Sequence, residues 1–383
     1  MEIQSIIDDD GNAEHTQQNF IIFDDSKGSL TEPGKLEVPP LSTAVKRLRG
    51  RDEDAMGVWM EGARAAECHL EWEAFKAAAG MVNFQLPVLI TGTSINGIGF
   101  EAARVIAKYA NLVIITGYSA ERLKLSEETI KKEFPSANIR PLVLDLSSLA
   151  AVRRAAAEVN AYAEPIHILI NNAAASGGPF ELSVDGFELQ MATDHIGPFL
   201  FTKLIAPKLL ASATATFTPR VVFVASMTHA FGPGIDFSTV AHPDPAKYHP
   251  MGAYSQAKSA NILMAIELSK RAHGKINAYS LHPGSIFTNI TQKPGRRAAL
   301  QEIGFLGADG QPNSEKTEWK TIPQGAATTV AAAFDTRIED KSGAYLDDGT
   351  EANAKLAAHC ADPENAEKLW TITEQIIGEP FTF

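Results

Sequence analysis

The residues in this chain best suited to acid–base chemistry are a tyrosine and a lysine four positions apart, Tyr254 and Lys258. On a helix, residues at this spacing lie on one face, so both side chains can point into the same cleft. The pair is weak evidence by itself. Its position strengthens it, because it follows Ser226, which comes directly after the apolar run 221–224, and lies downstream of a glycine-rich segment. The order makes the three residues candidates for one catalytic site.

The glycine-rich segment 91–99 follows the apolar run 87–90 directly and precedes a helical pattern. Glycines there allow a tight turn and let backbone N–H groups approach a pyrophosphate at a helix N-terminus, where the helix dipole favours an anion. Placement between a first strand and a first helix makes this a dinucleotide-binding signal rather than an ordinary turn. The candidate cofactor-binding residues are Thr91, Gly92, Ser94, Gly97, Ile98 and Gly99.

The end of the second apolar run bears on the choice of cofactor. NAD-binding proteins usually carry an acidic residue there, which accepts hydrogen bonds from the ribose 2′-hydroxyl. Residues 116–120 contain no acid, and Ser119 and Arg122 could bind a 2′-phosphate. The sequence therefore predicts NADP(H) rather than NAD(H), although a Glu121–Arg122 surface pair would give the same pattern.

Six short apolar runs must position these residues, with helix-period stretches between them. Runs without alternation are typical of strands buried on both faces, and strict alternation of strand and helix predicts a parallel sheet. The fold class is therefore α/β, a doubly wound parallel sheet (Rossmann fold). The expected strands are 87–90, 112–115, 140–144, 167–170, 221–224 and 276–280, and the first helices are 100–109, 120–134 and 149–162.

Composition excludes several classes of function. The 383 residues carry a formal net charge of −12, and no basic stripe occurs, so nucleic acid is a poor candidate partner. The two cysteines, Cys68 and Cys360, lie far apart without histidines at metal-ligand spacing, so neither a disulfide nor a metal site is expected. No apolar run approaches the roughly 18 residues of a membrane span. The N-terminus lacks the pattern of a secretory signal, and we expect a cytoplasmic protein.

The chain divides into an extension and one domain. Residues 1–80 are acidic and without regular periodicity, which predicts a largely disordered extension with a helix near 55–80. Residues 81–383 are expected to form a single Rossmann-fold domain. The polar, glycine-containing segment 286–321 follows the sixth expected strand.

In their order, these motifs resemble the classical short-chain dehydrogenase/reductase family, and most of all its retinol-dehydrogenase and WW-domain-oxidoreductase-like group. The resemblance covers residues 86–333. It rests on Thr-Gly-x4-Gly-Ile-Gly at 91–99, Asp145-Leu146, Asn-Asn-Ala-Ala at 171–174, Ser226, Tyr-x3-Lys at 254–258 and Pro283-Gly284-x3-Thr288.

The resemblance implies a role for each matching residue. Tyr254 would be the general acid or base, Lys258 would bind the nicotinamide ribose and favour the tyrosinate form, and Ser226 would hold the substrate oxygen. Asp145, with Leu146, would contact the adenine; Asn172 would line the cofactor cleft, and Thr288 would contact the carboxamide. The resemblance also implies that residues 81–383 are a dehydrogenase domain and that segment 286–321 is its substrate lobe, which differs among family members and therefore leaves the substrate undefined. The implied function is hydride transfer between NADP(H) and a small-molecule substrate, interconverting a ketone or aldehyde and its alcohol, in lipid or specialised metabolism.

Two departures from the family pattern affect the expected site. Four residues separate Gly92 from Gly97 where three are usual, which predicts rearranged phosphate contacts. Asp194 stands at the position of the family's relay asparagine, which lies at a local kink of its helix. An aspartate near Lys258 is expected to form an ion pair that competes with Tyr254 for the ammonium, which would alter the pH profile.

Other interpretations stay open at this point. His229, three residues after the serine, is the best histidine for touching substrate, but a hydrogen-bonded loop histidine is the commoner reading. A catalytically silent dinucleotide sensor that acts through protein partners is the alternative function. Family members often pair through long helices, so a homo-oligomer is also open.

Overall fold

The computed structural model describes residues 86–383, and all of them belong to one compact unit. The predictions for the extension 1–80, including the helix near 55–80, lie outside the described residues. No helix in the described part of the chain is both long and apolar enough to cross a membrane.

The centre of the fold is an eight-stranded sheet with the order β10-β9-β6-β5-β4-β1-β2-β3. All neighbouring pairs are parallel except β9 and β10. The strands are β1 Pro87–Ile90, β2 Leu112–Gly117, β3 Ile139–Val143, β4 Ile168–Asn171, β5 Arg220–Val224, β6 Asn277–His282, β9 Tyr345–Asp347 and β10 Thr350–Glu351. The first six confirm the strands expected from the apolar runs, and the doubly wound parallel sheet is confirmed with them.

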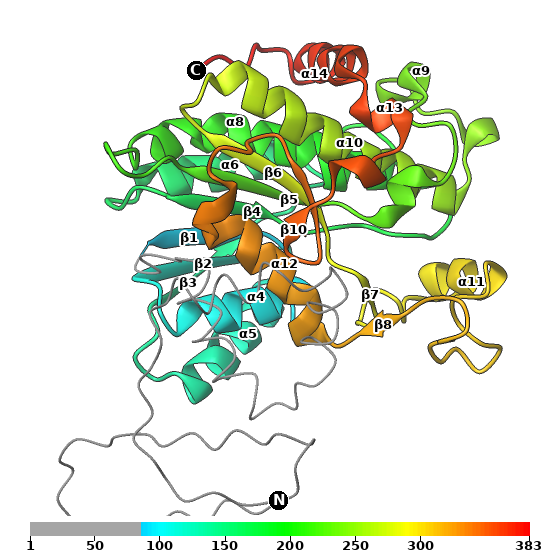
Figure 1. The fold of residues 1–383 in the computed structure, drawn as a ribbon, viewed down its shortest axis with the longest axis horizontal. Helices are drawn as coiled ribbons and strands as arrows, with labels where there is room; N and C mark the ends of the chain where they lie inside the picture. The colour runs from blue at the N-terminus through cyan, green and yellow to red at the C-terminus, as the bar shows by residue number, and fades with distance from the viewer. Residues whose placement is uncertain (1–85) are drawn as a thin grey trace, which may run out of the picture. The chain divides into compact units, whose positions relative to one another are not determined.

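Helices cover both faces of this sheet (Figure 1). One face carries α4 Ile98–Ala107, α5 Ala120–Glu133 and α12 Ile322–Phe334. The other carries α6 Leu149–Ala161, α8 Gly197–Leu210 and α10 Pro250–Ala272, with α14 Pro363–Ile377 packed against α10. Short segments connect them: α7 Leu189–Met191, η1 Ala192–Ile196, η2 Met227–Ala230, α9 Phe237–Val240, η3 Pro245–Lys247, η4 Thr336–Ile338, η5 Asn353–Lys355 and α13 Ala358–Ala361.

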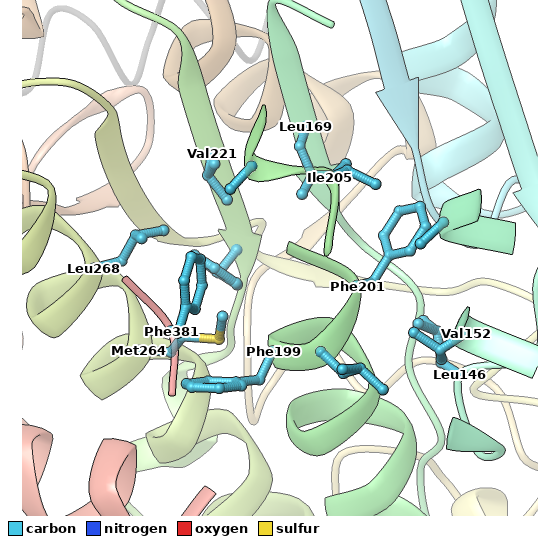
Figure 2. Close-up of a cluster of buried hydrophobic side chains, with 14 of the residues drawn as sticks. Leu146, Val152, Leu169, Phe199, Phe201, Ile205, Val221, Met264, Leu268 and Phe381 are labelled. Atoms are coloured by element: carbon cyan, nitrogen blue, oxygen red, sulfur yellow. The ribbon is translucent and has the colours of Figure 1, made fainter. Parts of the chain in front are cut away.

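Alternate side chains of each strand enter opposite cores, which explains the absence of polar alternation. Leu89 belongs to the cluster under α6, α8 and α10, whereas Val88 and Ile90 belong to the cluster under α4, α5 and α12. Figure 2 shows part of the first cluster, where Phe199 of α8 lies beside Phe381 near the C-terminus. Their rings pack edge to face with centroids 5.6 Å apart, so the C-terminal segment closes this core.

The strand order reverses between β1 and β4, and ligands of such sheets bind outside the carboxyl ends of the strands at this point. The glycine-rich segment follows β1 and the Asn-Asn motif follows β4, so both lie at this position. The fold therefore places the expected cofactor site where a dinucleotide can reach it.

The expected substrate lobe has a structure of its own. Strands β7 Ser285–Ile286 and β8 Trp319–Lys320 pair in parallel, and α11 Pro294–Glu302 lies between them in sequence. In Figure 1 this lobe extends to one side of the sheet. The lobe thus begins at the carboxyl end of β6, next to the expected cofactor site.

Candidate active site

The glycine-rich loop is clamped to the end of β4 by one amide. Asn172 Nδ2 donates to the carbonyl oxygens of Thr91 at 2.8 Å and Gly92 at 3.0 Å. A Cβ atom at Gly99 would lie 2.1 Å from that same nitrogen, so only glycine leaves room for the clamp. Gly92 has a φ of 72°, and its Cβ would lie 2.6 Å from Ala173 Cα. Both glycines are therefore required by close approach of the backbone.

The additional residue of the loop is taken up in one turn. Asn96 adopts a left-handed φ of 62°, a conformation that asparagine tolerates better than most residues. The N–H of Gly97 then donates to Ser94 O at 3.1 Å, which closes the turn. The lobe supports it from outside, because Asn289 Nδ2 donates to Ile95 O at 3.0 Å. The loop keeps its glycine contacts with β4 despite the insertion.

The start of α4 fits a pyrophosphate. Its N-cap is Gly97, which offers no side-chain cap, so the first N–H groups of the helix are left for another acceptor. Together with the tight glycine cradle, this donor set matches the phosphates of a nicotinamide dinucleotide. Thr91, Gly92, Ser94, Gly97, Ile98 and Gly99 are the residues that would hold it.

The other predicted cofactor residues lie at the same edge of the sheet. Ser119 caps α5, its Oγ accepting from Arg122 N at 3.3 Å, and the Arg122 guanidinium donates to Tyr118 Oη at 3.1 Å. Asp145 follows β3 and accepts from Ser147 N at 2.9 Å. Two further predicted residues are buried, Leu146 after β3 and Thr288 at the start of the lobe.

Lys258 links α10 to the strand that leads to Ser226. Its Nζ lies 5.4 Å from the ring centroid of Tyr254, which confirms that the two side chains share one face of the helix. The same Nζ donates to Val224 O in β5 at 3.1 Å. Ser226 follows two residues later, and α10 packs against the short helix η2 that Ser226 caps. The structure therefore brings Ser226, Tyr254 and Lys258 together at the carboxyl end of β5.

Asp194 reaches this lysine from a break in the neighbouring helix. Residues 192–196 form a π-helical turn, η1, between α7 and α8. Such a turn widens the helix and is frequent at functional sites. It presents Asp194 Oδ2 to Lys258 Nζ at 3.1 Å, while Oδ1 accepts from Ala175 N at 2.7 Å. The ion pair expected for Asp194 is present.

Burial dominates the electrostatics of this pair. The side chains of Lys258 and Asp194 are 2% and 0% exposed. Burial raises the pKa of the Asp194 carboxyl, and the Lys258 ammonium opposes that rise only in part. Burial also lowers the pKa of Lys258, but the Asp194 and Tyr254 charges outweigh it, so its pKa is raised overall and it stays cationic.

His229 is held by the fold. It is 2% exposed, its Nδ1 lies 2.7 Å from Ser226 O, and its Nε2 accepts from Ala357 N at 3.4 Å. Since Nδ1 donates to a carbonyl while Nε2 accepts a hydrogen bond, the ring is neutral with the proton on Nδ1. Burial lowers its pKa accordingly. Both ring nitrogens have partners, as in a hydrogen-bonded loop histidine, and the ring also lines the cavity beyond Ser226, so the substrate contact stays a prediction.

Beyond Ser226 lies a cavity of about 390 Å³. Met227, Ala230, Gly284 and Lys320 are among its lining residues, but neither Tyr254 nor Lys258 is. It adjoins the Ser–Tyr–Lys group and does not contain it.

Sequence reasoning missed two side chains at this centre. Asn261 Oδ1 accepts from Lys258 Nζ at 3.2 Å, and its Nδ2 donates to Asp194 O at 2.6 Å. Asn261 lies three residues after Lys258 in a largely apolar stretch, and this spacing could have predicted a contact between the two side chains. Arg296 of α11 places its guanidinium carbon 4.4 Å from the Tyr254 ring centroid, and nothing in the sequence marks it.

Comparison with known proteins identifies the family. Residues 87–241 match the family model described as short chain dehydrogenase. Short-chain dehydrogenase TIC 32 A, chloroplastic, of Brassica napus is 37% identical over 300 residues, covering 76% of this chain and 88% of that protein. The WW domain-containing oxidoreductase of Danio rerio is 33% identical, covering 77% and 69% respectively. Retinol dehydrogenase 13 of Mus musculus is 32% identical, covering 76% and 83%.

Solved structures agree on the fold. An uncharacterised protein from Mycobacterium paratuberculosis superposes with a TM-score of 0.59 at 27% identity, covering 80% of this chain and 98% of its own. Pseudomonas aeruginosa RhlG, in an active-site complex with NADP, gives 0.52 at 23% identity over 70% of this chain and 97% of its own. The chain belongs to the short-chain dehydrogenase/reductase family and is an oxidoreductase acting on CH–OH groups with a nicotinamide dinucleotide.

Replacing Gly99 by alanine should weaken dinucleotide binding by about 10- to 100-fold, because the new methyl group displaces the Asn172 amide and opens the loop. Titration of NADPH fluorescence measures it. Gly252→Ala is the matched control, since its Cβ would meet His249 Cβ at an ordinary 3.5 Å. Equal affinities for Gly99→Ala and Gly252→Ala would contradict the steric role of Gly99.

Replacing Asp194 by asparagine should shift the pH profile of alcohol oxidation. The Asp194 carboxylate partly neutralises the positive charge of Lys258. Without that carboxylate, the full charge of the ammonium acts on Tyr254 and favours the tyrosinate form. Oxidation needs the basic form, so its rising limb should move to lower pH by about one unit. The measurement is kcat/KM against pH. Identical pH profiles for the wild type and Asp194→Asn would show that Asp194 does not compete with Tyr254 for Lys258.

Proposed function

We propose that this protein is an NADP(H)-dependent oxidoreductase that interconverts a ketone or aldehyde and its alcohol, with Tyr254 as general acid or base. The observation that carries the proposal is the Lys258 ammonium, which faces the Tyr254 ring at 5.4 Å and is anchored on Val224 of the strand leading to Ser226. An enzyme needs this arrangement, whereas a silent sensor has no use for all three groups.

Each residue of the group has a defined task. Ser226 Oγ accepts from Thr228 N at 3.2 Å, which leaves its own proton to donate to the substrate oxygen. Tyr254 exchanges a proton with that same oxygen, and the buried Lys258 cation stabilises the charge left on the phenol. The nicotinamide, when bound, supplies or accepts the hydride. The geometry of Ser226 and Tyr254 then orients the reacting carbon.

The preference for NADP(H) is supported by the end of β2. Ser119 and Arg122 lie side by side there, Arg122 is exposed, and residues 116–120 present no carboxylate to a ribose 2′-hydroxyl. A 2′-phosphate would gain the Arg122 cation as a partner.

The test is oxidation of NADPH and of NADH, followed by absorbance, against a panel of ketones and aldehydes. We expect turnover that prefers NADPH. Tight NADPH binding without turnover of any carbonyl would favour the dinucleotide sensor instead. Equal use of both cofactors would reject the assigned role of Ser119 and Arg122 while leaving the chemistry in place.

The setting of the reaction is also proposed from the sequence. We propose a cytoplasmic enzyme of lipid or specialised metabolism that is active as a homo-oligomer. The relative TIC 32 A is named as chloroplastic. Cell fractionation and the solution mass test location and oligomeric state separately.

A further inference from the structure

A buried arginine lies directly over the proposed catalytic tyrosine. Arg296, in the first turn of α11, is 9% exposed, and its guanidinium carbon lies 4.4 Å from the Tyr254 ring centroid. Its Nη1 contacts Met251 Sδ at 2.9 Å. Within residues 86–383 no carboxylate pairs with it. The guanidinium therefore occupies the position between the lobe and the reacting centre.

The backbone fixes this position. A Cβ atom at Gly177 would lie 2.8 Å from Arg296 Cα, and one at Gly295 would lie 2.5 Å from Gly178 Cα. The start of α11 thus packs directly on the glycine pair that follows β4. Arg296 reaches Tyr254 because α11 packs on Gly177 and Gly178. The substrate lobe, of which α11 is part, therefore places the Arg296 charge at the site.

The surroundings leave this cation poorly compensated. A guanidinium carries five N–H donors and stays charged at all working pH values, whereas a thioether is a weak acceptor. Burial lowers the pKa of Arg296, although Tyr254 partly offsets this. Arg220, which is also buried, has the partners that a buried guanidinium usually has: Glu339 at 3.5 Å and the Ala332 carbonyl at 3.2 Å. An unpaired buried charge is costly, so Arg296 is suited to an anion supplied from outside the described chain.

We propose that Arg296 binds a carboxylate on the substrate, so that the substrates are oxo acids or hydroxy acids. This inference rests on the proposed function, since it assumes that the substrate carbonyl meets Tyr254. A guanidinium binds a carboxylate through two parallel hydrogen bonds, which fixes orientation as well as affinity. A single negative charge matches the Arg296 guanidinium, because Lys258, which also lies beside Tyr254, is already paired with Asp194.

The test compares acids with their neutral esters. Phenylglyoxylate and para-carboxybenzaldehyde, each beside its methyl ester, are assayed with the wild type, Arg296→Gln and Arg296→Lys. We expect the wild type to prefer the acids, and Arg296→Gln to lose about 100-fold in kcat/KM on the acids but only about threefold on the esters. Arg296→Lys should retain part of the preference. Arg297→Gln is the matched control, because Arg297 is adjacent but exposed and donates to Asp309 O at 2.8 Å.

Two outcomes would overturn the inference: no preference for acids in the wild type, or an unchanged acid-to-ester preference in Arg296→Gln, which includes equal losses on acid and ester. Equal losses would mean that Arg296 only holds the lobe in place. If no carbonyl is turned over, the proposed function fails. Calorimetric titration of the NADP+-loaded protein with both acids then tests, independently of turnover, whether Arg296 binds a carboxylate. Acid binding that Arg296→Gln abolishes supports the site, and no acid binding to the wild type rejects it.

Discussion

Replacing Tyr254 by phenylalanine should lower kcat by about a thousand-fold or more while leaving NADPH affinity within about threefold, because only the proton-exchanging hydroxyl is removed. The ring itself is held by its neighbours. Lys258 Nζ lies 5.4 Å and the Arg296 guanidinium carbon 4.4 Å from its centroid, and phenylalanine keeps both contacts. The variant therefore leaves no cavity, and lost activity would report on chemistry alone. Single-turnover rates and an NADPH titration measure the two quantities.

Tyr248 supplies the matched control. Its hydroxyl is also hydrogen bonded near the site, donating to Gly178 O at 3.0 Å and accepting from Gln190 Nε2 at 3.2 Å. Tyr248→Phe should cost about 1 kcal/mol of stability and leave kcat within about threefold. If Tyr254→Phe kept substantial turnover, Tyr254 would not be the general acid or base, and the sensor interpretation would gain weight.

The main sheet could be predicted because its first six strands are short apolar runs with no alternation, as burial on both faces requires. The pair β9 and β10 at the edge of the sheet could not be predicted from the sequence. Tyr345–Asp347 is a three-residue strand between Gly343 and Gly349, and it carries an acid at its end. A short strand at the edge needs little apolar sequence, so tertiary pairing with β6 defines it rather than local pattern.

The site divides in the same way. Ser226, Tyr254 and Lys258 stand in local motifs, and the fold brings them together as the motifs predict; their catalytic roles stay predictions. Arg296 and Arg297 are adjacent arginines, and only the packing of α11 on Gly177 makes one buried and the other exposed. The ion pair of Asp194 was foreseeable from its motif position. Its complete burial was not, because that depends on how η1 packs against α10.

That burial should make the loss of Lys258 costly to stability. Its ammonium is the partner of a carboxylate that is 0% exposed, and it also donates to the Val224 carbonyl and the Asn261 amide oxygen. Lys258→Met removes the charge at similar volume. Asp194 is then left as an uncompensated buried carboxylate, which typically costs about 3–5 kcal/mol. The free energy of unfolding from denaturant titration should fall by that amount.

The double variant separates this electrostatic cost from lost packing. Adding Asp194→Asn to Lys258→Met removes the stranded charge and keeps the Ala175 N–H acceptor, so most of the lost stability should return. Turnover should not return, because the double variant still lacks the cation that stabilises the phenolate of Tyr254. Rescue of stability without rescue of activity would show that one buried ion pair serves both the fold and the chemistry. Equal destabilisation of single and double variants would instead mean that the cost comes from the Val224 and Asn261 contacts, and that Asp194 is protonated in the folded enzyme.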